Sequence, residues 1–388
     1  MKIFVTGTRG IPDISGGVEK HCQELYPLIA AKGHEVIVST RDSYVNDLNL
    51  KVWKGVRLGH THAPRKKSIE AIFHTFLSVI KAKRCNPDIL HVHAVGPALM
   101  VPFARLLGMK VVFTHHGPDY DRQKWGGTAK LALRMGEWFG GLFASEVIVI
   151  SSIIESIIKT KCWRNSNLVY NGVPIPNKSD KTDFLQAYSV EPGRYILAVA
   201  RFVPEKGLHL LTEAFQKLNE PGIKLVIAGD ADHETTYSRE LKSSIANDPR
   251  IVSTGYITGE PLNQVYSHAG LFVLPSFHEG LPIALLEAMS YDLPVLVSDI
   301  AANREVDLPE ERFFKCGDVH DLQAKLEALW DKGLTNEEQW HFQSLISEKY
   351  NWEKIASQTI EVYKQAIGQR GHTDDPVDRD SVSKAVSF

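Results

Sequence analysis

Two cations and two carboxylates in the second half of the sequence have types and spacings that suit a common ligand. Arg201 ends an apolar stretch and Lys206 follows five positions later, so the pair could hold a diphosphate or could be solvated surface charges. Glu279 lies in a loop with Gly and Pro, and Glu287 lies eight positions on, in an apolar run typical of a helix. A carboxylate among core residues must be paired or must accept hydrogen bonds, which sugar and ribose hydroxyls can donate. A solvent-facing helix residue is the alternative for Glu287.

Glycine and histidine pairs follow two apolar stretches of the first half. Gly16 and Gly17 stand just before an expected helix, where backbone N–H groups can approach a phosphate. A turn that requires positive φ would need the same residues. His115 and His116 end a predicted strand, and alternation along the strand turns their side chains to opposite sides. At most one of them therefore faces a site, and a structural role is the competing interpretation.

The fingerprints of nucleotide-cofactor and metal sites are incomplete. The first Gly-rich loop, TGTRGIPDISGG, fits neither GxGxxG nor GxxxxGK[ST], which argues against a dehydrogenase. The pairs Asp119-x-Asp121 and Asp230-x-Asp232 lie in loops after strands but have no third ligand nearby. We therefore predict no metal site.

These residues are positioned by a recurring order of strands and helices. Continuous Val/Ile/Leu runs without polar alternation predict parallel strands buried on both faces. The predicted strands are 2–8, 35–40, 88–93, 110–116, 146–151, 195–201, 224–230, 271–276 and 294–299. Helices are expected between them, including 18–32, 68–84, 207–218 and 281–290. This order predicts an α/β protein with two doubly wound parallel sheets.

The chain is expected to divide near residues 171–183, a stretch rich in Pro, Asn, Lys and Asp. We predict one Rossmann-like domain over 1–180 and a second over 186–350. Residues 351–367 should form an amphipathic helix that packs back on the first domain. Residues 368–388 have the composition of a disordered tail.

Composition and charge limit the class of protein. With 43% hydrophobic and 23% charged residues among 388, the chain is a folded globular protein, and its four cysteines form no CxxC pair. It has neither a membrane-spanning apolar run nor a signal-peptide pattern, so we expect a cytoplasmic protein. Residues 1–185 carry a formal charge of +10 and residues 186–388 one of −12. The basic half could meet an anionic membrane, a phosphorylated substrate or a nucleic acid.

The basic half contains an amphipathic stretch over residues 65–84. Its Ile and Phe residues recur at helical spacing, between flanking Lys and Arg residues. Such a helix can lie on an anionic bilayer, whereas the same stripe is also found when a helix packs on a sheet. We predict peripheral membrane binding through this stretch.

Taken in order, the motifs resemble those of the retaining glycosyltransferases of family 4. The matching elements are Gly16-Gly17, His116-Gly117, Arg201 to Gly207, Gly229-Asp230, and Glu279 with Glu287. The resemblance covers about residues 1–367. It implies the GT-B fold, in which two Rossmann-like domains face each other across a cleft. The opening TGTRGIPDISGGVEKH looks like a subgroup that adds rhamnose, glucose or related sugars to bacterial polysaccharide precursors.

The resemblance implies a role for each residue of the second domain. The donor would be a nucleotide diphosphate sugar, most simply a UDP-sugar, and no other cofactor is implied. Arg201 and Lys206 would neutralise its diphosphate, and Glu287 would accept the two ribose hydroxyls. Glu279 and the loop that follows it in the sequence would together bind the transferred sugar. That loop consists of Gly280, Leu281, Pro282 and Ile283.

From the first domain, His116 would reach the sugar, and Gly16 and Gly17 would let a loop approach the diphosphate. The implied acceptor is a glycan or a lipid-linked glycan of cell-surface polysaccharide synthesis, at the inner face of the membrane, and no nucleic acid is implied. The leaving phosphate would take the proton of the acceptor, so no enzyme nucleophile is needed. Ala231 stands where the family often has the second glycine of Gly-Asp-Gly, which leaves the contacts to the base open.

Two other functions compete with this interpretation. A nucleotide-sugar epimerase of the same fold would need acid and base groups at the sugar and would turn over the donor without an acceptor. A non-catalytic nucleotide-sugar-binding protein would have lost the diphosphate cations or the glutamate pair, and all four residues are present.

Overall fold

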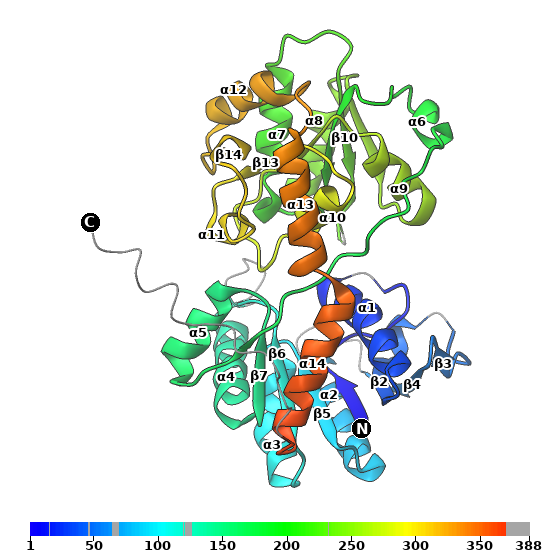
Figure 1. Cartoon of the computed structure of the whole chain (residues 1–388), viewed down its shortest axis with the longest axis vertical. Coiled ribbons are helices and arrows are strands. Elements are labelled where there is room, and N and C mark those ends of the chain that lie inside the picture. The colour runs from blue at the N-terminus through cyan, green and yellow to red at the C-terminus, as the bar shows by residue number, and fades with distance from the viewer. Residues whose placement is uncertain are drawn as a thin grey trace.

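A computed structural model of the chain describes residues 1–369 except 15, 46, 64–69, 119, 121–125 and 232. It contains two sheets, one in each half of the chain, which lie at opposite ends of the molecule (Figure 1). The predicted tail lies outside the described residues from position 370 on, and so does the start of the predicted basic helix.

The first sheet has eight strands in the order β3-β4-β2-β1-β5-β6-β7-β8. Neighbouring strands are parallel except β3 and β4, an antiparallel pair at the edge. The central strands are buried along most of their length because helices cover both faces of the sheet. The strands are β1 (Lys2–Thr6), β2 (Glu35–Arg41), β3 (Val52–Trp53), β4 (Val56–Thr61), β5 (Ile89–His93), β6 (Val111–His115), β7 (Glu146–Val149) and β8 (Asn167–Leu168).

The helices of this half divide between the two faces of the sheet. On one face, α1 and the C-terminal helix α14 pack their apolar side chains against one set of strand residues. On the other face, α2, α3, α4 and α5 pack against the alternate set. The bounds are α1 (Gly17–Ala31), α2 (Glu70–Cys85), α3 (Val101–Leu106), α4 (Gly127–Phe143), α5 (Ser152–Cys162) and α14 (Trp352–Ala366).

The second sheet has six parallel strands in the order β11-β10-β9-β12-β13-β14. They are β9 (Tyr195–Val199), β10 (Lys224–Ala228), β11 (Ile251–Gly255), β12 (Leu271–Leu274), β13 (Val295–Ser298) and β14 (Phe313–Phe314). Helices α7, α8 and α12 pack on one face and α9, α10 and α13 on the other. The helices are α6 (Asp183–Ala187), α7 (Leu208–Gln216), α8 (Thr236–Ala246), α9 (Gly259–Ser267), α10 (Ile283–Ser290), α11 (Ala301–Arg304), α12 (Val319–Leu329) and α13 (Asn336–Glu348).

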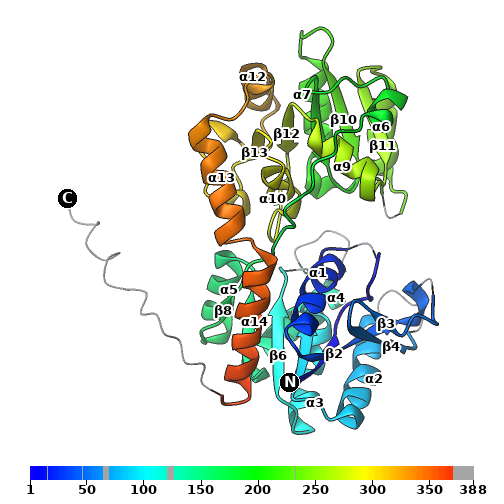
Figure 2. The same ribbon diagram turned by 45° about the vertical axis from the view of Figure 1, so that its right-hand side comes forward.

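The chain passes between the two halves twice, and the two crossings lie side by side (Figure 2). Val173 pairs with Asn351 in an isolated parallel bridge, and its N–H donates to the Tyr350 carbonyl at 2.9 Å. Gly172 lies against the Trp352 indole so closely that a Cβ would come within 2.6 Å of a ring carbon. The second crossing leads into α14, so this helix packs on the N-terminal sheet.

The predicted α/β class with two parallel sheets is confirmed. The observed strands lie close to the predicted bounds wherever the sequence has a continuous apolar run. The short edge strands β3, β8 and β14, the partly exposed strands β4 and β11, and α4, a helix with several glycines, lack such a run and were missed. Within the part of the chain that the structure describes, no helix is long and apolar enough to cross a membrane.

Candidate active site

The loop after β9 carries the two predicted diphosphate cations. Arg201 is half-buried just beyond the strand, and Lys206 ends a short 3₁₀ turn, Pro204–Lys206. Gly207 follows with a φ of 63°, and a Cβ there would come within 2.0 Å of the Pro275 carbonyl oxygen. Only glycine avoids both the strain and the clash. The loop after β9 therefore packs directly on the loop after the neighbouring strand β12.

Lys206 and Glu279 form an ion pair between these two loops. Lys206 Nζ lies 2.6 Å from Glu279 Oε1, and Ser276 Oγ donates to the same oxygen at 2.6 Å. The Glu279 side chain is only 9% exposed, so its charge depends on these partners. The ammonium of Lys206 can bind phosphate oxygens, and the adjacent Glu279 carboxylate can accept hydrogen bonds from hydroxyl groups.

The loop after Glu279 touches the first half of the molecule. A Cβ on Gly280 would lie 2.9 Å from the His116 carbonyl oxygen, and the Gly117 Cα lies close to the same position. The ends of β6 and β12 therefore meet across the gap between the two sheets. This is where ligands of doubly wound sheets bind, because the carboxyl ends of the strands open there.

The backbone of the same loop offers few free amides. Pro282 has no N–H, and the Ile283 N–H donates to the Leu281 carbonyl at 2.9 Å. This leaves the amides of Gly280 and Leu281 as candidates for a ligand. The Ile283 amide is better explained by the turn that begins α10.

Glu287 lies half-buried on α10, at the side that faces α1. Tyr266 OH donates to Glu287 Oε2 at 3.3 Å. Burial raises the pKa of the Glu287 carboxyl, and the nearby Lys20 ammonium of α1 acts in the opposite direction. Lys20 itself pairs with Glu24 at 3.0 Å. The carboxylate thus lies at the gap between the halves, with acceptor capacity left for ligand hydroxyls.

The two glycines at the start of α1, the N-cap residue Gly16 and the first helical residue Gly17, have different explanations. Gly16 has a φ of 143°, and a Cβ there would lie 2.0 Å from a carboxylate oxygen of Glu19. That carboxylate accepts a hydrogen bond from the Arg9 N–H at 2.9 Å, so the local turn accounts for Gly16. At Gly17, which is exposed, a Cβ would meet no described atom within 4 Å. Space for a ligand is therefore available at Gly17.

Three histidines come together beside the contact between the halves. His93 Nδ1, at the end of β5, lies 2.9 Å from His116 Nε2, and the His21 ring of α1 is 4.8 Å from the His116 ring between centroids. Burial lowers the pKa of His21 to about 4 and places the pKa values of His93 and His116 well below the ordinary range. The imidazoles are neutral at pH 7, so His116 can exchange hydrogen bonds with hydroxyls but brings no charge.

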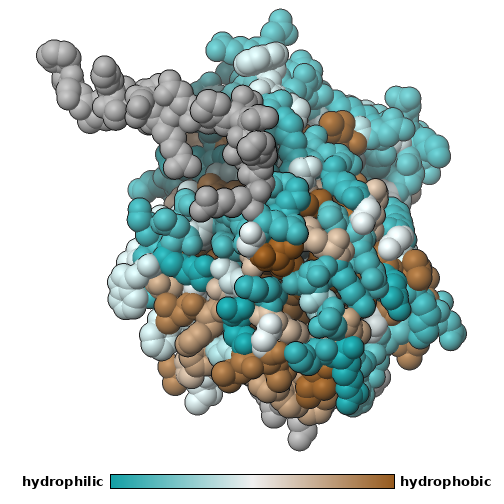
Figure 3. Space-filling model, turned by 60° about the horizontal axis from the view of Figure 1, so that its bottom comes forward, coloured by the Kyte–Doolittle hydropathy of each residue, from teal (hydrophilic) through white to brown (hydrophobic). Residues whose placement is uncertain are grey.

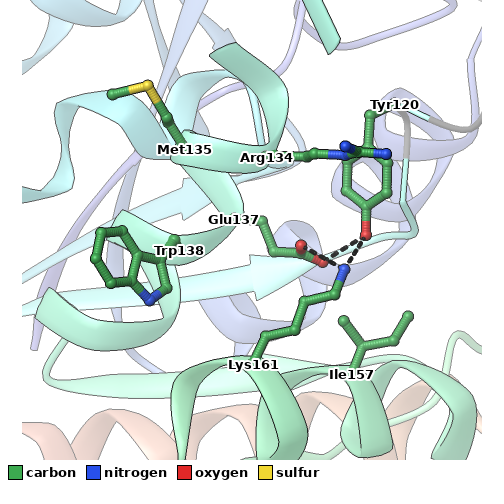
Figure 4. A pocket seen from close by; sticks show the side chains of 7 residues that line it. All are labelled: Tyr120, Arg134, Met135, Glu137, Trp138, Ile157 and Lys161. Atoms are coloured by element: carbon green, nitrogen blue, oxygen red, sulfur yellow. Dashed lines mark hydrogen bonds and ion pairs between the residues drawn. The ribbon is translucent and has the colours of Figure 1, made fainter. Parts of the chain in front are cut away.

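His115 points away from His116, as strand alternation predicts, and contacts a second polar group formed by Glu137, Tyr120 and Lys161. Figure 4 shows these three side chains. His115 Nδ1 accepts from the Gly117 N–H and His115 Nε2 donates to Glu137 Oε1, each at 3.0 Å. Glu137 also accepts from Tyr120 OH at 3.0 Å and from Lys161 Nζ at 3.1 Å. Burial would raise the pKa of Glu137, but the hydrogen bonds from His115 and Lys161, together with the Lys161 charge, outweigh burial and lower it.

This polar group forms one wall of a pocket of about 620 Å³. The remaining lining is the Arg134 guanidinium and an apolar surface made of Met135, Trp138 and Ile157. Figure 4 shows Arg134 beside the Tyr120 ring. The pocket therefore combines cations with apolar surface, and His115 connects it to Gly117 at the contact between the halves.

The acidic pairs gain no support as a metal site. Asp230 Oδ1 is 2.8 Å from Lys242 Nζ, so its charge is already matched by a cation. Asp119, Asp121 and Asp232 lie outside the described residues.

The residues that support the predicted ones were not identified from the sequence. Glu137 and Lys161 stand in no motif. His21 ends the segment TGTRGIPDISGGVEKH and Ser276 ends a predicted strand, but no role was assigned to either, and only the fold brings them to their partners. His93 had a usable signal, because His91-Val-His93 in a buried strand turns two imidazoles to one face.

Two Rossmann-like sheets whose strand ends meet, with cations and carboxylates at that edge, define a protein of the GT-B glycosyltransferase class. Comparison with family models agrees: "Glycosyltransferase Family 4" matches residues 15–175, and "Glycosyl transferases group 1" matches residues 180–344. The chain belongs to the family 4 glycosyltransferases and is a nucleotide-sugar-dependent glycosyltransferase. The family and fold that the sequence motifs indicated are thus confirmed.

Curated relatives carry the same activity in their names. A protein of Methanocaldococcus jannaschii named as an uncharacterized glycosyltransferase is 26% identical over 96% of this chain and 100% of its own length. The sulfoquinovosyl transferase SQD2 of Arabidopsis thaliana is 26% identical over 73% of this chain and 58% of its own.

Solved structures share the fold at lower identity. Sucrose-phosphate synthase from Thermosynechococcus elongatus has a TM-score of 0.78 at 22% identity and covers 94% of this chain and 98% of its own. Anabaena HepE in complex with UDP-glucose has a TM-score of 0.76 at 17% identity and covers 94% of this chain and 99% of its own.

Proposed function

We propose that the protein transfers a sugar from a UDP-sugar, with retention of configuration, to a lipid-linked glycan used for a cell-surface polysaccharide. The observation that carries this proposal is the nearly buried Lys206–Glu279 pair, at the edge where the β12 loop meets His116. It combines the two charges that a sugar diphosphate requires, one for the phosphate and one for the sugar hydroxyls.

In this proposal the donor lies between the two halves. Lys206 and Arg201 neutralise the diphosphate, with Arg201 able to contact two oxygens at once. When the phosphate draws Lys206 toward itself, Glu279 keeps its hydrogen bond from Ser276 and gains hydroxyl donors from the sugar. Glu287 accepts the ribose hydroxyls, and the neutral His116 reaches the sugar from the first half.

The proposed transfer needs no nucleophile from the protein. The acceptor hydroxyl oxygen bonds to the sugar anomeric carbon on the face that the diphosphate leaves. The bond between that carbon and the phosphate oxygen breaks, and the hydroxyl proton passes to the departing phosphate. Negative charge develops on the leaving group, and Arg201 and Lys206 stabilise that charge where it forms.

We propose a uridine nucleotide as the donor because of a solved structure with the same fold. Anabaena HepE, which shares the fold, was crystallised with UDP and with UDP-glucose. The relative named as a putative teichuronic acid biosynthesis glycosyltransferase of Bacillus subtilis, 25% identical over 61% of this chain and 58% of its own, supports a polysaccharide pathway.

The proposed lipid-linked acceptor is supported by an apolar surface on the N-terminal half. Helices α2, α3 and α4 cover the same face of the first sheet, and their outward sides carry large apolar side chains between 36% and 86% exposed. We call this surface the apolar face; it consists of Phe73, Phe76, Leu106, Leu131, Met135, Trp138 and Leu142. Figure 3 shows apolar side chains gathered on the lower end of the N-terminal half.

The geometry of α2 supports the membrane-facing interpretation of its apolar stripe. The side that faces the sheet carries small or polar residues, Thr75, Ser78, Val79 and Ala82, all buried. Phe73 and Phe76 are instead 39% exposed, so packing on the sheet does not explain them. The basic residues 65–67 that precede this stripe lie outside the described residues.

Cations beside the apolar face favour an anionic bilayer as its partner. Lys130 and Arg134 lie next to the Leu131–Leu142 stripe of α4, and Lys161 lies at the pocket behind it. Apolar insertion and attraction to anionic headgroups then act together. We therefore propose a peripheral position at the cytoplasmic side of the membrane, with the pocket near Glu137 close to the lipid end of the acceptor.

Donor binding and transfer are testable separately. In a thermal-shift panel of UDP, GDP, ADP and dTDP with their sugars, UDP and one UDP-sugar should raise the Tm most, because ligands that bind the folded state stabilise it. Transfer of labelled sugar from that donor to extracted membrane lipids, followed by NMR of the product anomer, tests acceptor and stereochemistry. If no nucleotide raises the Tm, or if the donor is epimerised without any acceptor, the proposal is wrong.

A further inference from the structure

The histidine cluster beside the donor site has the geometry of a metal-binding site. One ring nitrogen from each of His21, His93 and His116 lies within 4.8 Å of the corresponding nitrogens of the other two. Tetrahedral coordination at the usual distance of about 2.0–2.1 Å for imidazole and zinc would place such nitrogens roughly 3.3 Å apart. His93 Nδ1 and His116 Nε2 are 2.9 Å apart, slightly less than this distance. Small ring rotations are enough to bring the nitrogens to the distance that tetrahedral coordination requires.

One nitrogen of the cluster has no hydrogen-bond partner among the described residues. His21 is 3% exposed, and its Nε2 is buried and unpartnered. Its Nδ1 lies 2.6 Å from Asn171 Oδ1, which accepts only if Nδ1 carries the proton. Nε2 therefore presents a lone pair, and that is the form in which imidazole binds a metal.

In His21 and His93, the ring nitrogen that does not face the cluster already contacts an oxygen, as is usual for metal-binding histidines. Metal-binding histidines usually donate their other N–H to an oxygen, which fixes the ring orientation. Asn171 Oδ1 does this for His21, and Tyr26 OH contacts His93 Nε2. His91 Nδ1 lies 2.9 Å from the same hydroxyl, so Tyr26 is itself held in place.

We propose that His21, His93 and His116 bind a divalent transition metal of the zinc class. Three neutral imidazoles with no carboxylate among them suit zinc, cobalt or nickel and do not suit magnesium or calcium, which prefer oxygen ligands. His116 is half-buried, so the fourth position opens toward the gap between the halves, where water can complete the coordination. Because His116 also serves the donor in the proposed function, the bound metal inhibits transfer.

The test is a cobalt titration of the full-length protein after treatment with EDTA and removal of the chelator. We expect one Co²⁺ per chain with the visible absorption of a four-coordinate site, displaced by Zn²⁺ and unaffected by excess Mg²⁺. The His21→Gln variant should lose this absorption and bind Co²⁺ at least tenfold more weakly.

His74→Gln is the matched control. His74 is also fully buried, with an unpartnered Nδ1, but lies in α2 outside the cluster. This variant should keep the cobalt spectrum of the wild type. Should His21→Gln fail to fold by circular dichroism, His116→Gln replaces it, because His116 is half-buried at a loop.

The outcomes separate this proposal from the proposed function. A cobalt spectrum that is absent, or that survives unchanged in His21→Gln or in His116→Gln, overturns the metal site and leaves the transfer activity untouched. Cobalt binding that His21→Gln removes supports the site whether or not transfer is inhibited. If such binding has no effect on transfer, the role of His116 at the donor is what fails.

Discussion

The donor side and the histidine side of the candidate site are built in different ways. Lys206, Ser276 and Glu279 come from the loops after two neighbouring strands, β9 and β12, and each loop is a continuous motif. His21, His93 and His116 come from a helix and two strand ends that lie far apart in the sequence. Short motifs identify the first kind of site, whereas only the fold shows that the three histidines of the second lie together.

The two sides also differ in charge. The donor side holds a lysine and a glutamate in contact, and the histidine side holds imidazoles whose burial keeps them neutral. If this contrast reflects function, removing a charge on the donor side should strongly lower the rate of transfer. The histidine side should instead bind metal ions and exchange hydrogen bonds with hydroxyls.

The largest effect is expected from the diphosphate cations. Arg201→Ala and Lys206→Ala should each lower kcat/KM by roughly 10²–10³-fold, about 3 kcal/mol, because each removes charge that stabilises the leaving group. Initial rates with saturating and limiting donor measure the effect.

The matched control is Lys242→Ala, which removes an exposed lysine paired with Asp230 on the same half. It should change kcat/KM by less than a factor of about three, since exposed pairs contribute little. Equal loss in Lys242→Ala and Lys206→Ala would mean that general charge, and not the β9 loop, determines the rate.

A smaller and more selective effect is expected at the two glutamates. Glu287→Ala should weaken nucleotide binding by about 1.5–3 kcal/mol, because it removes a charged acceptor for the ribose. Glu279→Ala should mainly lower turnover. Calorimetry with UDP together with kcat measures the difference, and unchanged binding and turnover in both variants would contradict the assignment.

The pH dependence of binding sharpens this prediction. Burial raises the pKa of Glu287, so its carboxylate becomes protonated at a higher pH than that of an exposed glutamate. Protonation removes acceptor capacity, and affinity for UDP should fall as the pH decreases from 7 toward 5. Glu287→Gln should show a flatter profile. A wild-type profile as flat as that of the variant would exclude Glu287 from the ribose site.

The fold could be predicted from the sequence more fully than the contacts that build the candidate site. Buried parallel strands need continuous apolar runs, so β1, β9 and β12 could be located from residue types alone. The Lys206–Glu279 contact follows from the adjacency of β9 and β12, which the sequence does not state. The Glu137 group depends on a glycine-rich helix, α4, whose pattern does not show which residues face outward.

A moderate effect is expected at the membrane. Leu131→Glu with Trp138→Glu should weaken binding to phosphatidylglycerol vesicles roughly tenfold or more, since each substitution replaces apolar insertion by repulsion from anionic headgroups. Vesicle flotation at low and high salt measures it. Trp340→Glu is the matched control, because Trp340 is 71% exposed but lies on α13 in the acidic half. A Trp340→Glu protein that binds as weakly as the α4 variant, or wild-type protein that ignores the vesicles, would contradict the apolar face as the contact.

The smallest effect is expected from chelation. Transfer should survive EDTA, because the charge of the diphosphate is met by Arg201 and Lys206, and Asp230 is already paired with Lys242. A metal in the histidine cluster would lower the rate of transfer, because it would occupy His116. An essential metal cofactor would instead be required for the rate. EDTA should therefore leave the rate unchanged in metal-free buffer and restore it after micromolar Zn²⁺ has been added. A rate that falls with EDTA and recovers with Mn²⁺ would show that the two cations are insufficient for the leaving group. The contrast between a charged donor side and a metal-sensitive histidine side would then have to be abandoned.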